Sequence, residues 1–166
     1  MPLSARAINL VIFIGCVFAI LAAAYMEHVM KLYPCPLCIT QRAFIVLIGL
    51  LAFIAFIHNP GVTGRRSYAL AGVAAAIGGA YFAYHQLWLQ SLPADQVPAC
   101  GPGLAYMFEL FPFVEAFKML LQGDGTCAKI HLILGFSIPT WTLIAFIALA
   151  IINLFQVVRG KEGAVN

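Results

Sequence analysis

The sequence predicts an all-α integral membrane protein: a four-helix bundle of one domain, residues 1–166, with a short interfacial amphipathic helix. Apolar residues make up 63% of the chain and charged residues only 9%, against roughly half and a quarter in soluble domains. Mean hydropathy is +0.98. Four stretches are long enough to cross a bilayer, which takes about 20 mostly apolar residues. Lipid is therefore the expected solvent for much of the chain, and nothing in its small net charge favours nucleic acid.

The predicted spans are residues 7–26, 39–57, 67–89 and 132–158. The first span contains no charge and is too long for the apolar core of a signal peptide, so we expect it to be retained. The second carries one charge, Arg42, in its first turn. Loops 27–38 and 90–131 should share one side of the membrane.

Basic residues indicate which side that is, because cytoplasmic loops carry an excess of Lys and Arg. Five basic residues fall at the N-terminus, in the 58–66 loop or at the C-terminus: Arg6, Arg65, Arg66, Arg159 and Lys161. Three fall on the other side, at Lys31, Lys118 and Lys129. Acidic residues gather on that side too, at Glu27, Asp95, Glu109, Glu115 and Asp124. We therefore expect both termini to be cytoplasmic.

The long second loop contains a change of character. Residues 91–103 hold three prolines, two glycines and Cys100, which indicates a flexible, exposed segment. Residues 112–122 then combine a polar face (Glu115, Lys118 and Gln122) with apolar positions elsewhere. Eleven helical residues reach about 16 Å, too short to span. We expect an interfacial helix on the outer leaflet, or else an amphipathic helix packed on the bundle.

Four of the five cysteines fall outside the membrane on this topology. Cys35 and Cys38 lie in the first outer loop, and Cys100 and Cys127 lie in the second. Paired cysteines on that side are normally disulfides. Cys16 is in mid-span, where we expect it to act as a small apolar packing residue.

The Cys35-Pro36-Leu37-Cys38 motif has features that favour thiol chemistry. Pro36 suits the first turn of a helix, so Cys38 should sit near a helix N-terminus, where the dipole favours a thiolate. Arg42 follows at i+4, on the same face. An arginine at the membrane edge is costly, and a nearby anion would offset that cost. Together these features should favour the thiolate form of Cys38.

Other interpretations of the motif stay open. It is also compatible with a structural bridge or with half of a zinc site, although zinc would need a second close pair and Cys100 and Cys127 are 27 positions apart. Arg42 is compatible with an interface anchor. The alternative from another class is a non-catalytic tetraspan scaffold with structural external disulfides. His85, near the outer end of the third span, is either an ordinary interfacial residue or a neighbour of Arg42 in one pocket.

Four spans, the string Tyr33-Pro34-Cys35-Pro36-Leu37-Cys38 with Gln41 and Arg42 following, and a second cysteine pair around an amphipathic helix resemble the bacterial disulfide-bond formation protein B (DsbB) family. The resemblance runs from the first span to about Trp141. It implies an inner-membrane oxidase that takes electrons from a periplasmic DsbA-like dithiol protein and passes them to a membrane quinone, ubiquinone or menaquinone.

The resemblance also implies residue roles. Cys100 would react with the partner protein, Cys127 would be its resolving mate, and Cys35 and Cys38 would reoxidise that pair. Cys38 would adjoin the quinone, with Arg42 stabilising negative charge. His85 matches the family's histidine at the outer end of the third helix, which implies a quinone contact.

Some members of the family carry a tryptophan a few residues after the last cysteine, near the quinone. Here the stretch reads Ala128-Lys129-Ile130-His131-Leu132, so the resemblance does not transfer that contact. The nearest rival enzyme class resembles vitamin K epoxide reductase, in which the Cys-x-x-Cys usually lies near a late helix. An oxidase for another thiol substrate is a further alternative. No Gly-rich dinucleotide fingerprint is present, which disfavours NAD or FAD.

Overall fold

The computed structural model describes residues 4–93, 95–100 and 111–159. Four long helices make up the body: α1 (Ala5–His28), α2 (Pro36–His58), α3 (Val62–Ser91) and α6 (Ile138–Arg159). All four are long and apolar enough to cross a membrane. The predicted all-α, four-helix membrane bundle is confirmed, and the short extra helix is present as α5 (Phe113–Gln122).

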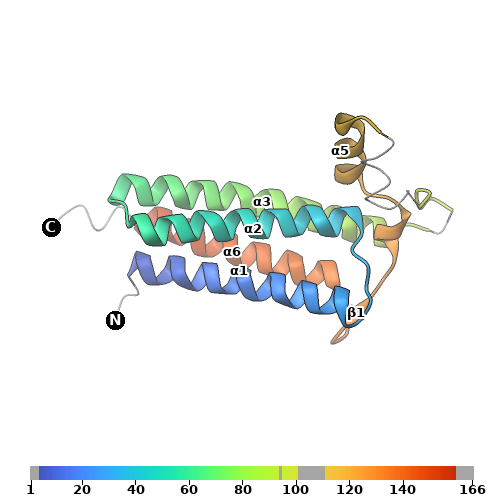
Figure 1. Cartoon of the computed structure of the whole chain (residues 1–166), viewed down its shortest axis with the longest axis horizontal. Coiled ribbons are helices and arrows are strands. Elements are labelled where there is room, and N and C mark those ends of the chain that lie inside the picture. Colours follow the sequence, from blue (N-terminus) through green and yellow to red (C-terminus); the bar gives the residue numbers. More distant parts are fainter. Residues whose placement is uncertain (1–3, 94, 101–110, 160–166) are drawn as a thin grey trace.

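The helices pack in the order α1, α2, α3, α6, with close contact between each successive pair. α1 and α6, both described in full, do not pack closely on each other. Figure 1 shows that α1 begins and α6 ends at the same end of the bundle. At the other end, α5 lies across the bundle axis (Figure 1) and packs against α2. A helix in this orientation has the direction expected of one that lies along a membrane surface.

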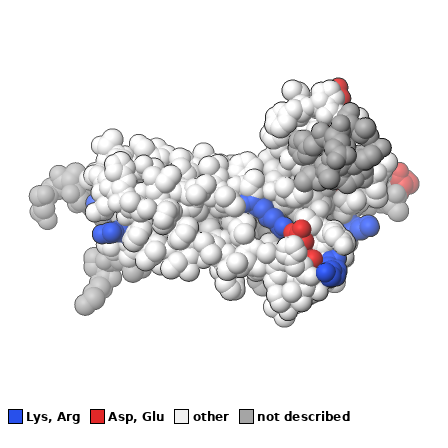
Figure 2. Space-filling model, in the orientation of Figure 1, with Lys and Arg blue, Asp and Glu red and all other residues white. Residues whose placement is uncertain are grey.

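On the face shown in Figure 2, blue side chains mark the end where α1 begins, and the half of the body next to them is uncharged. The other charged side chains begin near the middle of the body and extend to the opposite end (Figure 2). Arg6, Arg65, Arg66 and Arg159 all belong to the end where α1 begins, near the termini of their helices. Lys161 and Glu109, two of the charged residues used to predict the sides of the membrane, lie outside the described residues.

The starts of α3 and α6 differ most from the starts of the predicted spans. α3 starts at Val62 rather than 67, because Asn59, in the left-handed region (φ 41°), caps α2 and leaves a short connection. α6 starts at Ile138 rather than near 132. The preceding residues form an antiparallel hairpin of β1 (Leu132–Ile133) and β2 (Phe136–Ser137). Its two turn residues, Leu134 and Gly135, both have positive φ (53° and 86°), as two-residue hairpins prefer.

Glycines allow α3 to approach its neighbours closely. A Cβ at Gly79 would overlap the ring of Phe146, a fully buried α6 residue, and one at Gly72 would overlap the Asn153 side chain. Small residues at helix interfaces let the backbones approach closely, and van der Waals packing is one of the forces that hold helices together in lipid. Cys16 packs in the same way against Gly49 between α1 and α2, and it is buried, as predicted for a packing residue.

We predict that Gly79→Ala lowers the stability of the bundle. The added methyl group has to displace the Phe146 ring, and overpacking of this kind typically costs about 1–3 kcal/mol. Thermal unfolding of the detergent-purified protein measures the effect. Gly15→Ala is the matched control, because a Cβ at this α1 position meets nothing within 4 Å. Phe146→Leu should restore part of the loss in the Gly79→Ala background, and equal stability of the two alanine variants would contradict the packing account.

Candidate functional site: a thiol cluster at one end of the bundle

The Cys-x-x-Cys motif forms the start of α2. Cys35 is the N-cap residue, with an extended backbone (φ −76°, ψ 165°), and Pro36 occupies the first turn. The Cys35 Sγ accepts a hydrogen bond from the Cys38 backbone N–H at 3.4 Å. The predicted position of Cys38 near a helix N-terminus is therefore confirmed.

Three of the four outer cysteines meet at this point. Cys35 and Cys38 are free thiols whose Sγ atoms lie 3.0 Å apart. Cys127, in the 3-10 helix η1 (Gly125–Ala128), is fully buried and packs with Cys35, Leu37 and Leu89. The structure therefore places one member of the second cysteine pair directly against the first pair, although 89 or more positions separate them in the chain.

The contact between the Cys35 and Cys127 sulfurs shifts the pKa values of these two thiols in opposite directions. The Cys35 thiol donates to Cys127 and so lowers the pKa of Cys127. The contact with Cys127, then the contact with Cys38, then burial, raise the pKa of Cys35. The contact thus shifts Cys127 toward the thiolate, whereas Cys35 holds its proton more tightly because two sulfur acceptors surround it.

Two buried glutamines connect this cluster to α6. Gln86 of α3 directs its Nε2 to the Sγ atoms of both Cys35 and Cys38, at 3.4 Å each. Gln41 of α2 donates from its Nε2 to Gln86 Oε1 at 2.7 Å. The Thr142 hydroxyl of α6 donates to Gln41 Oε1 at 2.8 Å. The exposed fractions of Gln86 and Gln41 are 4% and 3%, so these polar groups satisfy one another rather than bonding to water.

Arg42 lies one turn below Cys38, but its partner is on α1. Its Nη1 is 2.5 Å from Glu27 Oε2, and its Nη2 donates to the Ala23 carbonyl at 3.3 Å. The anion that offsets the cost of this arginine is therefore Glu27, in the last turn of α1 rather than in the outer loop. Both side chains are about three-quarters buried.

His85 belongs to a different neighbourhood from Arg42. Its Nε2 is 3.0 Å from the Gln122 carbonyl at the end of α5, and its ring stacks between Tyr81 and Trp88. No hydrogen bond joins it to Arg42 within the parts of the chain that the structure describes. The α3 side chain that faces the sulfurs is the next one, Gln86.

Cys100 is exposed, but its backbone runs beside η1. The Gly125 N–H donates to the Ala99 carbonyl at 3.3 Å, and a Cβ at Gly125 would lie 3.2 Å from the Cys100 backbone nitrogen. Gly125 thus permits a close approach of the two segments, two residues before Cys127. The second cysteine pair is split between a solvent-facing residue and a fully buried one.

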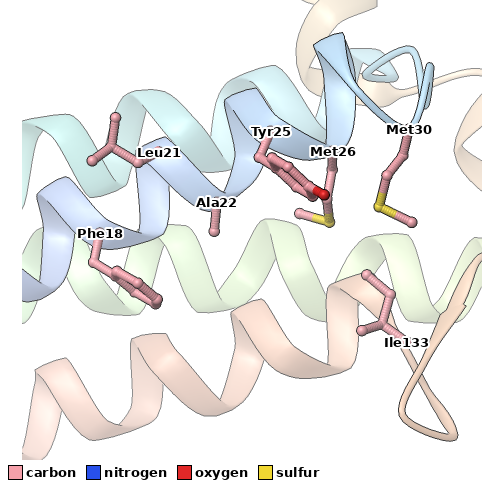
Figure 3. Close-up of a pocket in the computed structure, with 7 residues that line it drawn as sticks. All are labelled: Phe18, Leu21, Ala22, Tyr25, Met26, Met30 and Ile133. Carbon is pink, nitrogen blue, oxygen red and sulfur yellow. The ribbon is translucent and has the colours of Figure 1, made fainter.

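An apolar groove opens beside this end of α1. It has a volume of about 510 Å³ and is lined by six α1 or neighbouring residues and one hairpin residue: Phe18, Leu21, Ala22, Tyr25, Met26, Met30 and Ile133. Figure 3 shows Phe18, Ala22 and Met26 directed from α1 toward the α6 side, with Ile133 opposite. Ile133 is held in place by its carbonyl, which accepts from Trp141 Nε1 at 3.0 Å. Ala22 and Met26 adjoin Ala23 and Glu27, the two partners of Arg42.

Sequence reasoning did not identify Gln41, Gln86, Thr142 or Glu27 as site residues. The available signal was their chemistry, since uncharged amides and a carboxylate are costly within apolar spans unless they are paired. Gln41 also lies at i+3 from Cys38, on the same face of a helix. Over residues 4–93, 95–100 and 111–159, no group of three or more His, Cys, Asp or Glu side chains is arranged to hold a metal ion.

A buried thiol cluster at one end of four apolar helices defines a multi-pass membrane protein with a candidate redox site. Comparison with known proteins assigns the class more narrowly. The model of the family "Disulfide bond formation protein DsbB" matches residues 5–156, and the chain belongs to this family.

Curated relatives match over almost their whole length. Disulfide bond formation protein B of Saccharophagus degradans is 52% identical over 157 residues, covering 94% of this chain and 95% of the relative. The Hahella chejuensis protein of the same name is 51% identical, covering 91% and 94%. Disulfide bond formation protein B 1 of Pseudomonas aeruginosa is 43% identical, covering 96% and 99%. The chain is thus a membrane disulfide bond formation protein, and the resemblance found in the sequence is confirmed.

We predict that Cys35→Val raises the pKa of Cys127. The substitution removes the thiol that donates to Cys127, and burial, which already opposes the thiolate, then acts with less opposition. The reaction of Cys127 with a small methanethiosulfonate, followed by mass spectrometry from pH 5 to 9, should shift to higher pH and slow about tenfold at pH 7. Cys16→Val, which alters a buried thiol elsewhere, should leave the profile unchanged. A shift to lower pH would contradict the assigned donor.

Proposed function

We propose that the protein is a dithiol:quinone oxidoreductase of the bacterial inner membrane. In this proposal it reoxidises a periplasmic DsbA-like protein and passes the electrons through two cysteine pairs to ubiquinone or menaquinone. Membership of the disulfide bond formation family supports the oxidoreductase class. The observation that carries the detailed proposal is the contact of Cys127 with Cys35, since it joins the two pairs.

The first exchange takes place at the exposed cysteine. A thiolate of the reduced partner attacks Cys100 Sγ of a Cys100–Cys127 disulfide. That bond breaks, and its electron pair stays on Cys127. The partner's second thiolate then attacks the mixed disulfide, so that the partner leaves oxidised and Cys100 is released as a thiolate. Exposure of Cys100 and burial of Cys127 support this division, because only Cys100 is accessible to another protein.

The second exchange takes place inside the cluster. The Cys127 thiolate attacks Cys35 Sγ of a Cys35–Cys38 disulfide, and the electron pair of the broken bond stays on Cys38. Cys100 then attacks Cys127, which re-forms the outer disulfide and releases Cys35. The lowered pKa of Cys127 supports its role as the attacking thiolate. The 3.0 Å approach of the Cys35 and Cys38 sulfurs is compatible with a disulfide after a small adjustment.

The energetics limit the final acceptor. A DsbA-type protein is a strong oxidant, with a reduction potential of about −120 mV, so the acceptor has to lie above that value. A membrane quinone meets this requirement, whereas cytosolic glutathione does not.

The groove beside α1 fits the apolar part of a quinone. Its 510 Å³ falls within the usual range of ligand sites, about 300–1,000 Å³, and its lining is almost wholly apolar. When bound there, a quinone would supply a two-electron, two-proton acceptor. Phe18, Ala22 and Met26 would hold its chain, while Arg42 would stabilise negative charge near Cys38.

Glu27 gives Arg42 a competing partner. Since the guanidinium is already paired at 2.5 Å, part of that contact has to be given up when Arg42 faces a new anion. The contact of His85 with the end of α5 supports a role for His85 in positioning that helix. We also propose that His85 contacts the quinone. We propose that both termini are cytoplasmic, because the end of the bundle where they lie is rich in arginine. We also propose that α5 lies at the membrane interface, because it lies across the bundle axis.

We predict that the purified protein reduces quinone in detergent when a reduced DsbA-like protein is supplied. Quinol formation, followed by absorbance, should match the partner's dithiol one to one. Cys38→Ser should abolish it, because no thiolate forms beside the acceptor. Arg42→Ala should slow it by on the order of 100-fold, as expected for loss of a preorganised charge.

Arg65→Ala provides the matched arginine control for this experiment, since Arg65 lies at the far end of the bundle and binds the Pro60 carbonyl. It should leave quinol formation unchanged. Undiminished turnover by Cys38→Ser would exclude the mechanism.

We predict that Cys127→Ser traps the partner on Cys100. Without Cys127, the Cys100 thiolate attacks the disulfide of the oxidised partner, and only the partner's own released thiolate can reverse this reaction. A mixed disulfide should accumulate on non-reducing gels, and peptide mapping should locate it at Cys100. Mapping to Cys35 instead would reverse the assignment of the two pairs.

A further inference from the structure

We propose that Gln86 is a catalytic residue that donates hydrogen bonds to the reacting sulfurs, and that Gln41 and Thr142 are positioning residues that fix the orientation of its amide. The inference deepens the proposed function and rests on it, because Gln86 is catalytic only if Cys35 and Cys38 are the reacting thiols. The geometry that supports it is independent of any quinone or partner.

The first step of the argument is the position of Gln86. Its Nε2 lies 3.4 Å from Cys35 Sγ and 3.4 Å from Cys38 Sγ. A primary amide has two N–H donors, so one group can serve both sulfurs. Its exposed fraction is only 4%, and water therefore does not replace these donors. In an apolar setting, a donor to a thiolate is worth more than in water.

The second step is the direction of the Gln86 amide. Its Oε1 accepts from Gln41 Nε2 at 2.7 Å. If the amide were turned over, its oxygen would face the sulfurs and its two donors would face another donor. The bond to Gln41 thus commits the Gln86 N–H groups to the sulfurs.

The third step is the orientation of Gln41 itself. Its Oε1 accepts from the Thr142 hydroxyl at 2.8 Å, and its Nε2 also lies 3.5 Å from the Phe82 carbonyl. The single hydrogen of the Thr142 hydroxyl has a competing acceptor in the Pro139 carbonyl, at the longer distance of 3.0 Å, and we assign it to Gln41. Each group in the series from Thr142 to Gln41 to Gln86 therefore donates toward the sulfurs, across three different helices.

Gln86 also suits the protonated state of Cys38. The Cys38 thiol lies 3.7 Å from Gln86 Oε1 and can donate to it, whereas a thiolate accepts from Nε2. The same side chain can therefore follow the sulfur through its change of charge without moving far, which a purely apolar neighbour cannot do.

Other charged and titratable groups around Cys38 come from every neighbouring element. They are Cys35 before α2, Arg42 on α2, Cys127 on η1, Glu27 on α1 through Arg42, and His85 on α3, which is turned to Gln122. The substitutions below leave all of them in place, so a change in the behaviour of Cys38 reports on the amides.

The test measures alkylation of the reduced, full-length protein by iodoacetamide between pH 5 and 9, with each cysteine quantified by mass spectrometry. Gln86→Met keeps the volume but removes both donors. The Cys38 profile should move to higher pH, with about tenfold slower alkylation at a fixed pH below its midpoint, as expected for loss of a hydrogen bond to a charged group. Cys100, which is exposed, serves as the internal control and should not change.

Two further variants test the positioning residues. Gln41→Met and Thr142→Val should shift the Cys38 profile in the same direction, and by less at each step away from the sulfur, because Gln86 keeps its donors but loses their orientation. Gln86→Glu, in which acceptors replace the donors, should shift it more than Gln86→Met. If one of these variants fails to fold, the remaining variants still test the predicted order of the shifts.

Gln90→Met is the matched control, since Gln90 lies one turn further along α3 and its amide binds the Lys129 carbonyl at 3.2 Å. It should leave Cys38 unchanged. An unaltered profile in Gln86→Met, or an equal shift in Gln90→Met, would overturn the proposal. The readout needs neither quinone nor partner. A shift in Gln86→Met without quinol formation by the wild-type protein would thus refute the proposed function and still show that Gln86 donates hydrogen bonds to Cys38.

Discussion

The start of α2 is the constraint on which the rest of the site depends. Pro36 sets the first turn, so Cys35 becomes the cap and Cys38 follows one turn inside, with both sulfurs on one side of the helix. Leu37, which is fully buried, fixes the turn against Leu89 and Cys127. The sulfurs are therefore held by backbone geometry and packing rather than by flexible loops, and the groups from α3 and η1 only have to meet them.

The closely packed pair α3 and α6 provides the frame for these contacts. Because Gly72 and Gly79 admit Asn153 and Phe146 at short range, the two helices are fixed in register along their length. That register places Gln86 opposite the start of α2 and brings Thr142 to Gln41. The glycines near the middle of the bundle thus contribute to the geometry at its end, although they lie several turns away.

Hydropathy was sufficient to predict the four helices, because a span of apolar residues has few alternatives in lipid. It could not predict the hairpin before α6, since Leu132, Ile133 and Phe136 are as apolar as a helix would require and only Gly135 marks the turn. The cap at Cys35 and the first-turn Pro36 could be read from the motif, because they are local. The contact of Cys127 with Cys35 could not, since it depends on how a long loop folds back.

The sequence likewise could not predict that Gln86, rather than the neighbouring His85, faces the sulfurs. His85 was predicted as a site residue from its depth near Arg42 and from the family resemblance, yet successive residues on a helix point about 100° apart. Which of His85 and Gln86 faces the sulfurs depends on the rotation of α3, which is set by its packing on α6. The pairing of Arg42 with Glu27 was likewise hidden, because the predicted end of the first span placed Glu27 in the loop rather than in the last turn of α1.

The open arrangement of the helices has a further consequence. α1 packs on α2, and an apolar groove lies between α1 and the hairpin residue Ile133, on the α6 side of α1 (Figure 3). Cys100, by contrast, is exposed at the end of the molecule. In the proposed function, a quinone would reach the groove from the bilayer and the partner protein would reach Cys100 from water, at places that share no lining residue.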